Sequence, residues 1–196
     1  MLQCRRKVKL DALSIYYDIG AGLWRNSAVT TNFKLADLPN YTEFTALFDA
    51  YQINAVKISI VPLFNSGDPG QVSNSGNNYY SIPHLASVVD IDGAVSPPGD
   101  QATLLQYNNC KLRRLTKPTT IYIKNPRVAD AEYQNGVLSG YGEGQKKKWI
   151  DCSSPSVQHY GARWWMDTLN STGYGLDKRF QADVYVTYYV KFKRVI

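Results

Sequence analysis

Strict alternation of apolar and polar residues is the clearest pattern in the chain, and it is strongest near the C-terminal end. Apolar side chains occupy every second position from Phe180 to Phe192, and polar ones such as Asp183, Thr187 and Lys191 fall between them. This two-residue period predicts a half-buried strand. Its register should be firmly fixed, because a slip of one residue would turn the whole apolar face to solvent.

The N-terminal segment alternates in the same way, starting at Arg5. Val8 and Leu10 fall on one side of an extended chain, whereas Arg5, Lys7 and Lys9 fall on the other. The pattern predicts a first strand with one cationic face. Its phase changes soon afterwards, in DALSIYYD, as a bulge or bend would produce.

A helix followed directly by a strand is predicted in the next clear segment. Four apolar residues recur at the spacing of an amphipathic helix. They are Phe44, Leu47, Phe48 and Tyr51. Behind them Val56, Ile58 and Ile60 alternate with polar residues, which predicts a half-buried strand. Pro62 should end this strand.

The remainder of the chain predicts further strands, a second short helix and two long loops. The strand-like segments are HLASVVDIDG, KLRRLTKPTTIYIKNP with a break near Pro118, WIDCS and HYGARWWMDTL. Asp100 is a candidate cap for the second helix, which should run through Tyr107. The loops are polar and rich in glycine, and they cover residues 65–80 and 128–148.

These elements together predict the fold class. About eight strands, two inserted helices and no regular alternation of strands with helices are typical of an all-β chain. We therefore predict an eight-stranded antiparallel jelly-roll β-sandwich with two short inserted helices and long surface loops. A single such domain over residues 1–196 fits a chain without a break in composition.

Composition favours a polyanionic partner and argues against several protein classes. The net charge is +6, and fifteen tyrosines raise the aromatic share to 13%. No apolar run approaches the ~18 residues that cross a bilayer, so no membrane insertion is predicted. The three cysteines, Cys4, Cys110 and Cys152, form no C-x-x-C pair and favour neither a disulfide framework nor a zinc ribbon.

No catalytic, cofactor or metal site is predicted, and we interpret the chain as a protein that is not an enzyme. The motifs G-x-S-x-G, G-x-x-x-x-G-K-[ST] and H-E-x-x-H are absent, and the chain holds two histidines. Asp90 and Asp92 could form a nuclease-like metal pair, but a charged outer strand face explains them better. His159 has no second ligand near it in the sequence, so it is interpreted as a packing or turn residue.

Basic clusters give the one positive indication of a ligand. The candidates for nucleic-acid binding are Arg5, Arg6, Lys7, Lys9, Lys111, Arg113 and Arg114. A further cluster, Lys146 to Lys148, precedes Trp149. Each cluster alone is better explained as solvated surface. Cations beside exposed aromatic rings nevertheless favour binding of single-stranded nucleic acid, whose phosphates attract cations and whose bases stack on rings.

Three segments resemble the capsid proteins of circovirus-type viruses, which are small viruses with circular single-stranded DNA. The segments are LPNYTEFTALFDAYQINAVKISIVP, WIDCSSPSVQHYGARWWM and YVTYYVKFKRV. The resemblance implies a capsid protein whose identical subunits form a T=1 icosahedral shell around the circular genome, with the DNA on the inner surface. It also implies presence in the virion, assembly in the host nucleus, and outer loops open to a host attachment factor.

Capsid proteins of this kind usually begin with a long arginine-rich arm that lies inside the shell, contacts the DNA and directs nuclear import. In the present chain the first predicted strand starts near Arg5. Residues 1–9 resemble a short remainder of that arm. We therefore expect weak genome packaging and weak nuclear targeting.

Loop tyrosines are the candidates for subunit contacts, because aromatic side chains bury a large area at low entropy cost. They are Tyr79, Tyr80, Tyr133, Tyr141 and Tyr174. Packing of these rings onto their own domain is an equal alternative.

Two other functions fit a jelly roll. One is a carbohydrate-binding module, in which Trp164 and Trp165 would form a platform for sugar rings. The other is a protein that binds single-stranded nucleic acid without forming shells. A cupin-like enzyme fits less well, because the expected cluster of histidine ligands is missing.

Overall fold

The structure is a computed structural model of the full chain. It describes residues 1–18, 23–25, 27–63, 84–90, 96–134, 137–166 and 181–194. In this part the chain forms two β-sheets, with short helices in the connections. No helix of this part is long and apolar enough to span a bilayer.

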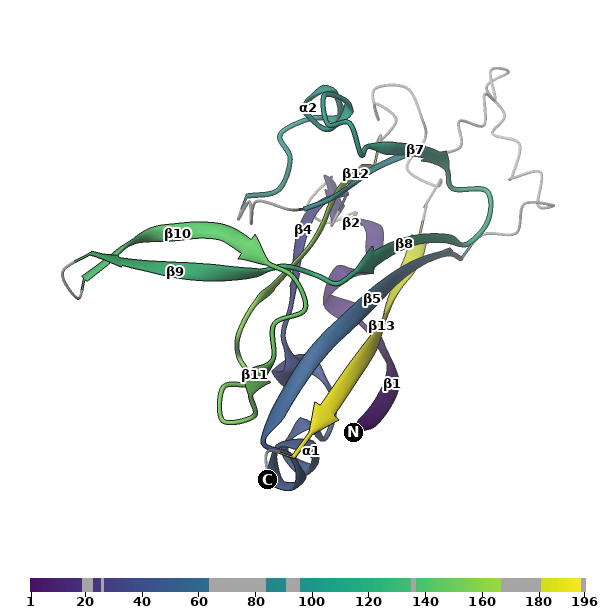
Figure 1. Cartoon of the computed structure of the whole chain (residues 1–196). Helices are drawn as coiled ribbons and strands as arrows, with labels where there is room; N and C mark the ends of the chain where they lie inside the picture. The colour runs from purple at the N-terminus through teal and green to yellow at the C-terminus, as the bar shows by residue number, and fades with distance from the viewer. Residues whose placement is uncertain are drawn as a thin grey trace, which may run out of the picture.

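The first sheet is built around two long strands, β5 and β13, which lie side by side (Figure 1). β13 also pairs with β1 and β2, β5 also pairs with β8 and β11, and β3 is added next to β2. The strands are β1 (Leu2–Lys9), β2 (Ile15–Asp18), β3 (Leu23–Arg25), β5 (Ala50–Pro62), β8 (Thr119–Lys124), β11 (Ile150–Asp151) and β13 (Gln181–Lys193). We call it the β5–β13 sheet.

The second sheet is built around β12, which pairs with β4, β6 and β9. The strands are β4 (Ala28–Phe33), β6 (His84–Val89), β7 (Lys111–Arg114), β9 (Val128–Gln134), β10 (Val137–Gln145) and β12 (His159–Met166). We call it the β6–β12 sheet. The helices are η1 (Asp11–Leu13), η2 (Leu35–Asp37), α1 (Tyr41–Leu47) and α2 (Gln101–Leu105).

The strand order is that of a jelly roll. The first sheet contains the sequence of neighbours β1–β13–β5–β8, and the second contains β4–β12–β6–β7. All these pairs are antiparallel. Two Greek keys folded into one sandwich give this order, so the predicted antiparallel jelly roll is confirmed. Additional short strands and a hairpin bring the described strands to thirteen, more than the eight expected.

Both predicted helices form, with different limits. In α2 the carboxylate of Asp100 accepts a hydrogen bond of 2.7 Å from the backbone N–H of Thr103, as predicted for a cap. The helix nevertheless ends at Leu105, before Tyr107. α1 ends at Leu47, and Tyr51 lies in β5, where it is fully buried. The prediction that Tyr51 continues the apolar face of the helix is therefore wrong, because β5 begins at Ala50.

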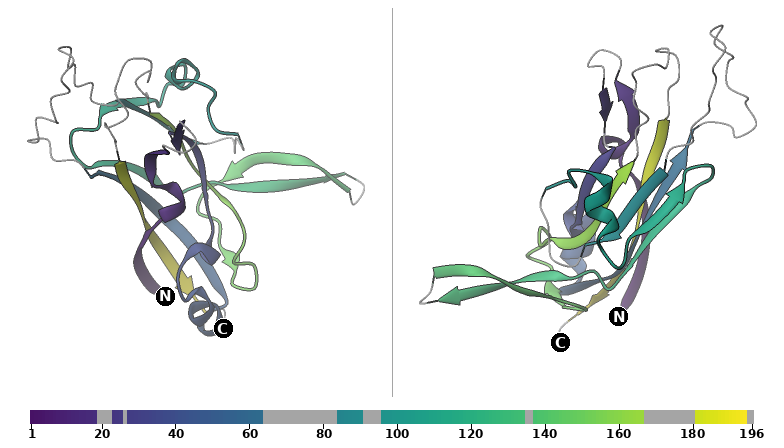
Figure 2. Two further views of the ribbon diagram at one scale, coloured as in Figure 1. Left: turned by 180° about the vertical axis from the view of Figure 1, so that it is seen from behind. Right: turned by 90° about the horizontal axis from the view of Figure 1, so that it is seen from above.

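The prediction of a loop over residues 128–148 is wrong for most of its length. β9 and β10 pair there as an antiparallel hairpin, with register shifts next to Gly140 and Gly142. Such shifts interrupt the two-residue period of β10. The segment of β9 does alternate in the sequence, with Ala129, Ala131 and Tyr133 alternating with polar residues, and the prediction overlooked it. Figures 1 and 2 show that the hairpin extends away from the other strands of both sheets.

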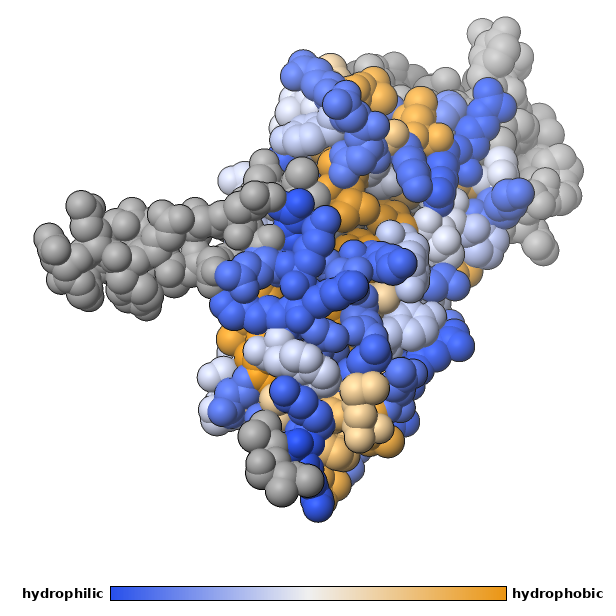
Figure 3. Space-filling model, viewed as in Figure 1, coloured by the Kyte–Doolittle hydropathy of each residue, from blue (hydrophilic) through white to orange (hydrophobic). Residues whose placement is uncertain are grey.

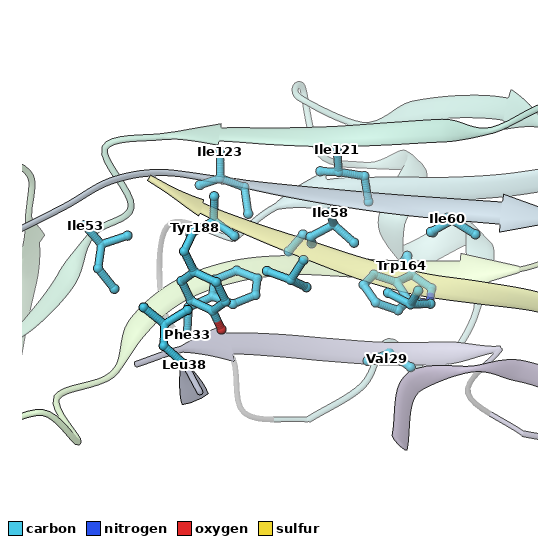
Figure 4. Close-up of a cluster of buried hydrophobic side chains, with 14 of the residues drawn as sticks. Val29, Phe33, Leu38, Ile53, Ile58, Ile60, Ile121, Ile123, Trp164 and Tyr188 are labelled. Carbon is cyan, nitrogen blue, oxygen red and sulfur yellow. The ribbon is translucent and has the colours of Figure 1, made fainter. Parts of the chain in front are cut away.

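The core lies between the two sheets and is lined by the alternating apolar residues. Figure 4 shows isoleucines of β5 and β8 meeting Val29 and Phe33 of β4, with Trp164 of β12 among them. Tyr188 packs its ring edge-on against Phe33 at 5.8 Å between centroids. The predicted faces of β5 and β13 are thus confirmed where the structure describes them.

The burial of Trp164 argues against a carbohydrate-binding platform. Its side chain is fully buried in the core, whereas Trp165 lies on the opposite face of β12 and packs into a small cluster with Ala86 and Leu104. Successive residues of a strand point to opposite sides, so the two indoles cannot form one flat surface.

His159 is a buried packing residue, and its burial predicts an acid-sensitive fold. The side chain is 1% exposed, and desolvation lowers its pKa to about 4 from a usual value of 6.5. Below pH 6.5 the unfolded chain binds a proton that the folded chain excludes, so stability falls as the pH decreases towards 4. Between pH 7 and pH 5 we expect this group to remove about 2 kcal/mol.

Urea unfolding of the dissociated subunit at pH 7 and pH 5 measures this effect. His159→Gln should lose less stability over that interval than the wild type. His84→Gln serves as the control, since its side chain is only half-buried at the end of β6. An equal pH dependence for His159→Gln and wild type would contradict the prediction.

Candidate nucleic-acid interface

The outer face of the β5–β13 sheet carries rows of cations and tyrosines. Residues that are paired across neighbouring strands share one face of a sheet. One row consists of Lys7, Thr187, Lys57 and Tyr122, taken from β1, β13, β5 and β8 in order. The next row consists of Arg5, Tyr189, Ala55 and Lys124. The pairing of four strands thus brings four cations together that are far apart in the sequence.

Tyrosine rings support the cations of β1. The Arg5 guanidinium lies 5.5 Å from the ring centroid of Tyr189, and the Lys7 ammonium lies 4.3 Å from that of Tyr185. These distances are within the range of cation–π attraction. Tyr122 meets Tyr189 edge-on at 6.3 Å and is itself 55% exposed. The face therefore offers fixed positive charge next to an open aromatic ring.

Lys9 differs from its neighbours because carboxylates offset its charge. Its ammonium lies 3.1 Å from Oδ2 of Asp183 and 3.4 Å from Oδ1 of Asp11. The hydrogen bond with Asp183 is the main cause that raises the pKa of Lys9. Of the predicted cations on this face, Arg5 and Lys7 are consequently better placed than Lys9 to attract an external anion.

The same face continues towards the C-terminal end of β13. Lys191 and Lys193 follow Tyr189 at alternate positions, and the Lys193 ammonium lies 4.7 Å from a ring centroid of Trp149. The Gln52 side chain donates a hydrogen bond to the backbone carbonyl of Lys147. The third basic cluster of the sequence thus reaches the face that carries Arg5 and Lys7.

Arg6 lies on the other side of β1. Its guanidinium is 5.8 Å from the ring centroid of Phe44 in α1, and Arg6 lines a shallow hollow together with Lys7, Val8, Pro39 and Asn40. Alternation along the strand separates it from Arg5 and Lys7. Arg6 therefore does not contribute to the row of cations.

The predicted cations Lys111, Arg113 and Arg114 belong to the other sheet, on β7. Arg113 donates a hydrogen bond of 2.5 Å to the carbonyl of Thr120, and Arg114 Nε lies 3.3 Å from Nε2 of His84. The seven candidate residues thus do not form one surface. For the β7 residues, nucleic-acid binding stays a prediction.

Lys124 and Tyr122 belong to this face but are not among the residues predicted from the sequence. Lys191 falls at a polar position of its predicted strand, and Lys57 is one of the polar residues between Val56 and Ile60, but the sequence does not assign the neighbours of either strand. A two-residue period tells which residues share a face within one strand, whereas the order of strands is a tertiary property. The segment TTIYIK alternates, and this pattern predicts that Tyr122 and Lys124 lie on the face of the strand that is opposite to the face of Ile121 and Ile123.

Only two of the five candidate interface tyrosines fall within the described residues. Tyr79, Tyr80 and Tyr174 lie outside them. Tyr133 is in β9, paired with Leu138, and Tyr141 is in β10, paired with Ala131. Their role in subunit contacts stays a prediction.

The described residues contain no group of three or more histidine, cysteine, aspartate or glutamate side chains placed to hold a metal ion. What the outer face offers instead is electrostatic attraction and ring surface. Contacts of this kind recognise the phosphates and the flat faces of bases and carry no base-specific readout.

Capsid proteins of icosahedral viruses, lectin domains and cupins all use the jelly roll, so the fold alone does not distinguish them, whereas comparison with known proteins does. The model of the circovirus capsid protein family matches residues 17–196. The chain therefore belongs to the circovirus capsid protein family, a family of structural proteins found in the virion. No curated protein matches the sequence.

Two solved structures of the BFDV capsid protein share the fold. The 60-mer form has a TM-score of 0.62 and 14% identity, over 98% of this chain and 92% of that one. The decameric form has a TM-score of 0.52 and 16% identity, over 98% of both chains. At such identities the likeness shows the fold alone.

Proposed function

We propose that the chain assembles into a T=1 icosahedral shell of identical subunits around circular single-stranded DNA. Membership of the circovirus capsid family supports a shell, and the related capsid protein that forms a 60-mer supports T=1 symmetry. Assembly in the host nucleus and binding of a host attachment factor by outer loops belong to the same proposal, on the strength of family membership.

The outer face of the β5–β13 sheet is the surface that we assign to the DNA. The observation that carries this assignment is the pair of adjacent rows that bring four cations and two tyrosines together across four strands. Single-strand binding proteins use the same combination, because cations follow the backbone while bases stack on rings. In a closed shell this face would line the interior.

Electron microscopy and sedimentation of the purified chain test the proposal. We expect regular particles of one diameter, and we expect circular single-stranded DNA to increase their yield at moderate salt. High salt should release the DNA, because binding to phosphates depends on displaced counterions. A protein that stays monomeric at all salt concentrations, or that coats DNA as beaded filaments, would contradict the shell and favour a binding protein that does not assemble.

A further inference from the structure

The tyrosine rings on the outer face of the β5–β13 sheet differ in what lies over them. The Lys7 ammonium lies over the ring of Tyr185, at 4.3 Å from its centroid. The Arg5 guanidinium lies over the ring of Tyr189, at 5.5 Å. Tyr122 is 55% exposed, and among the described residues no cation lies over its ring. Tyr122 therefore presents an open ring on a face whose other two tyrosines are already paired with cations.

The Tyr122 ring is held in place by its strand and by a neighbouring ring. β8 pairs with β5 along its whole length. The ring meets that of Tyr189 edge-on, with 6.3 Å between centroids and 71° between planes. An edge-on neighbour can cover no more than one of the two faces of a ring, so at least one face of Tyr122 is free of this contact. A ring that is already held loses little conformational freedom when a flat ligand stacks on it.

Two lysines lie next to Tyr122 on the same face. Lys57 is its cross-strand partner on β5, and Lys124 follows it by two residues on β8. Paired residues of neighbouring strands have Cβ atoms about 5 Å apart, and alternate residues of one strand are about 6.6 Å apart. In the described part of the chain neither lysine is ion-paired with a carboxylate. The open ring thus has two ammonium groups beside it that are available to an anion.

The surroundings of the ring match a nucleotide better than an apolar partner. Figure 3 shows mostly hydrophilic residues over β5 and β8. A protein partner that docks through an aromatic anchor normally covers an apolar surface around that anchor. A nucleotide within a single strand combines one flat base with a phosphate on either side. It can therefore use the ring and both ammonium groups at the same time.

A DNA duplex can use only part of this arrangement. Its phosphates are exposed and can contact the lysines, but each base is stacked on its neighbours and paired with the opposite strand. A base must leave the stack before it can lie on a protein ring, and the free energy of unstacking and unpairing opposes this step. The ring therefore adds affinity for a single strand that it does not add for a duplex, whereas the lysines attract both.

We propose that Tyr122 makes this face select single-stranded over double-stranded DNA, by stacking on one unpaired base whose flanking phosphates contact Lys57 and Lys124. This inference rests on the proposed function, because it concerns the same face. It deepens that function by separating two tasks, since the lysines supply attraction and the ring supplies selection. Stacking on a ring is tolerant of sequence, so the selection concerns the unpaired state of the DNA and not its bases.

Fluorescence anisotropy of the dissociated subunit with three probes tests the inference. The probes are oligo(dT), an abasic oligonucleotide with the same number of phosphates, and a duplex. The wild type should bind oligo(dT) about tenfold more tightly than the abasic probe, which is the usual contribution of one stacked base. Tyr122→Leu should bind these two probes equally, with little change in its affinity for the duplex. Tyr122→Phe keeps the ring and should restore the preference for oligo(dT).

Lys57→Gln is the matched control for charge and should weaken the binding of all three probes by a similar factor. A second measurement needs no variant, because bromouracil in the oligonucleotide can be photo-crosslinked to the wild type, and the crosslinked peptide should contain Tyr122. A wild type without the preference for oligo(dT), an unchanged preference in Tyr122→Leu, or a crosslink elsewhere would overturn the inference. A wild type that binds no probe, or full affinity in Lys57→Gln, would instead contradict the assigned DNA face.

Discussion

Replacing Lys7, Lys57 and Lys124 together with glutamine will weaken the binding of single-stranded DNA about a hundredfold at 0.1 M salt. The three ammonium groups belong to two adjacent rows on the outer face of the β5–β13 sheet. Each contact with single-strand phosphate contributes a log-log salt slope of about 0.7, which is roughly fivefold in affinity at 0.1 M. The slope of the triple variant should therefore be smaller by about 2.

Fluorescence anisotropy of labelled oligo(dT) with the dissociated subunit measures both quantities across a salt series. Replacing the same three lysines with arginine keeps the charge and should keep the affinity. Lys34→Gln with Lys117→Gln removes charge away from the face and should change the affinity little. If this second control lost as much affinity per charge as the triple variant, the binding would reflect overall charge and the assigned face would be wrong.

Gly161→Ala will destabilise the subunit by about 3 kcal/mol or more, the upper range for inserting a methyl group into a packed core. A Cβ at this position would lie 2.2 Å from the carbonyl oxygen of Thr31 and 2.6 Å from a ring carbon of Phe33. The carbonyl belongs to β4, so relief requires β4 and β12 to separate. That movement would also stretch the two hydrogen bonds between the Thr31 hydroxyl and the backbone of Ala162.

Differential scanning calorimetry of the dissociated subunit should show a midpoint lower by roughly 6–12 °C, from about 2–4 °C per kcal/mol for a chain of this size. Gly99→Ala is the matched control, because a Cβ there meets nothing within 4 Å. We expect Gly99→Ala to unfold within a degree or two of the wild type. An unchanged midpoint for Gly161→Ala would show that the two strands can separate at no cost.

The strands were predictable where one strict period covers a whole element. β13 and β5 bury the residues that the alternation assigned to the core, and β1 carries its predicted cations on one face. In each case the cost of exposing a row of apolar side chains fixes the face without knowledge of the neighbouring strands. For these three strands the local pattern alone was sufficient to predict the inward and outward faces.

Prediction failed where a bulge or an element boundary interrupts the period. The segment 128–148 was interpreted as a loop, because glycines and register shifts conceal the alternation of β10, and the short alternation of β9 was overlooked beside them. Tyr51 fitted a helical spacing, yet it belongs to β5 and contributes a buried ring to the core. At Tyr51 a short window of sequence cannot separate a helix from a strand, because both periods place an apolar residue there.

By itself the sequence determined the fold class, the inward and outward faces of the longest strands, and the basic character of the surface. The tertiary structure decided which strands are neighbours. Antiparallel pairing of β1, β13, β5 and β8 joins Lys7, Lys57 and Lys124 in one surface, while β7 carries its cations on the other sheet. The physical reason is that alternation is a property of one strand, whereas a surface across a sheet depends on hydrogen bonds between segments more than 50 residues apart.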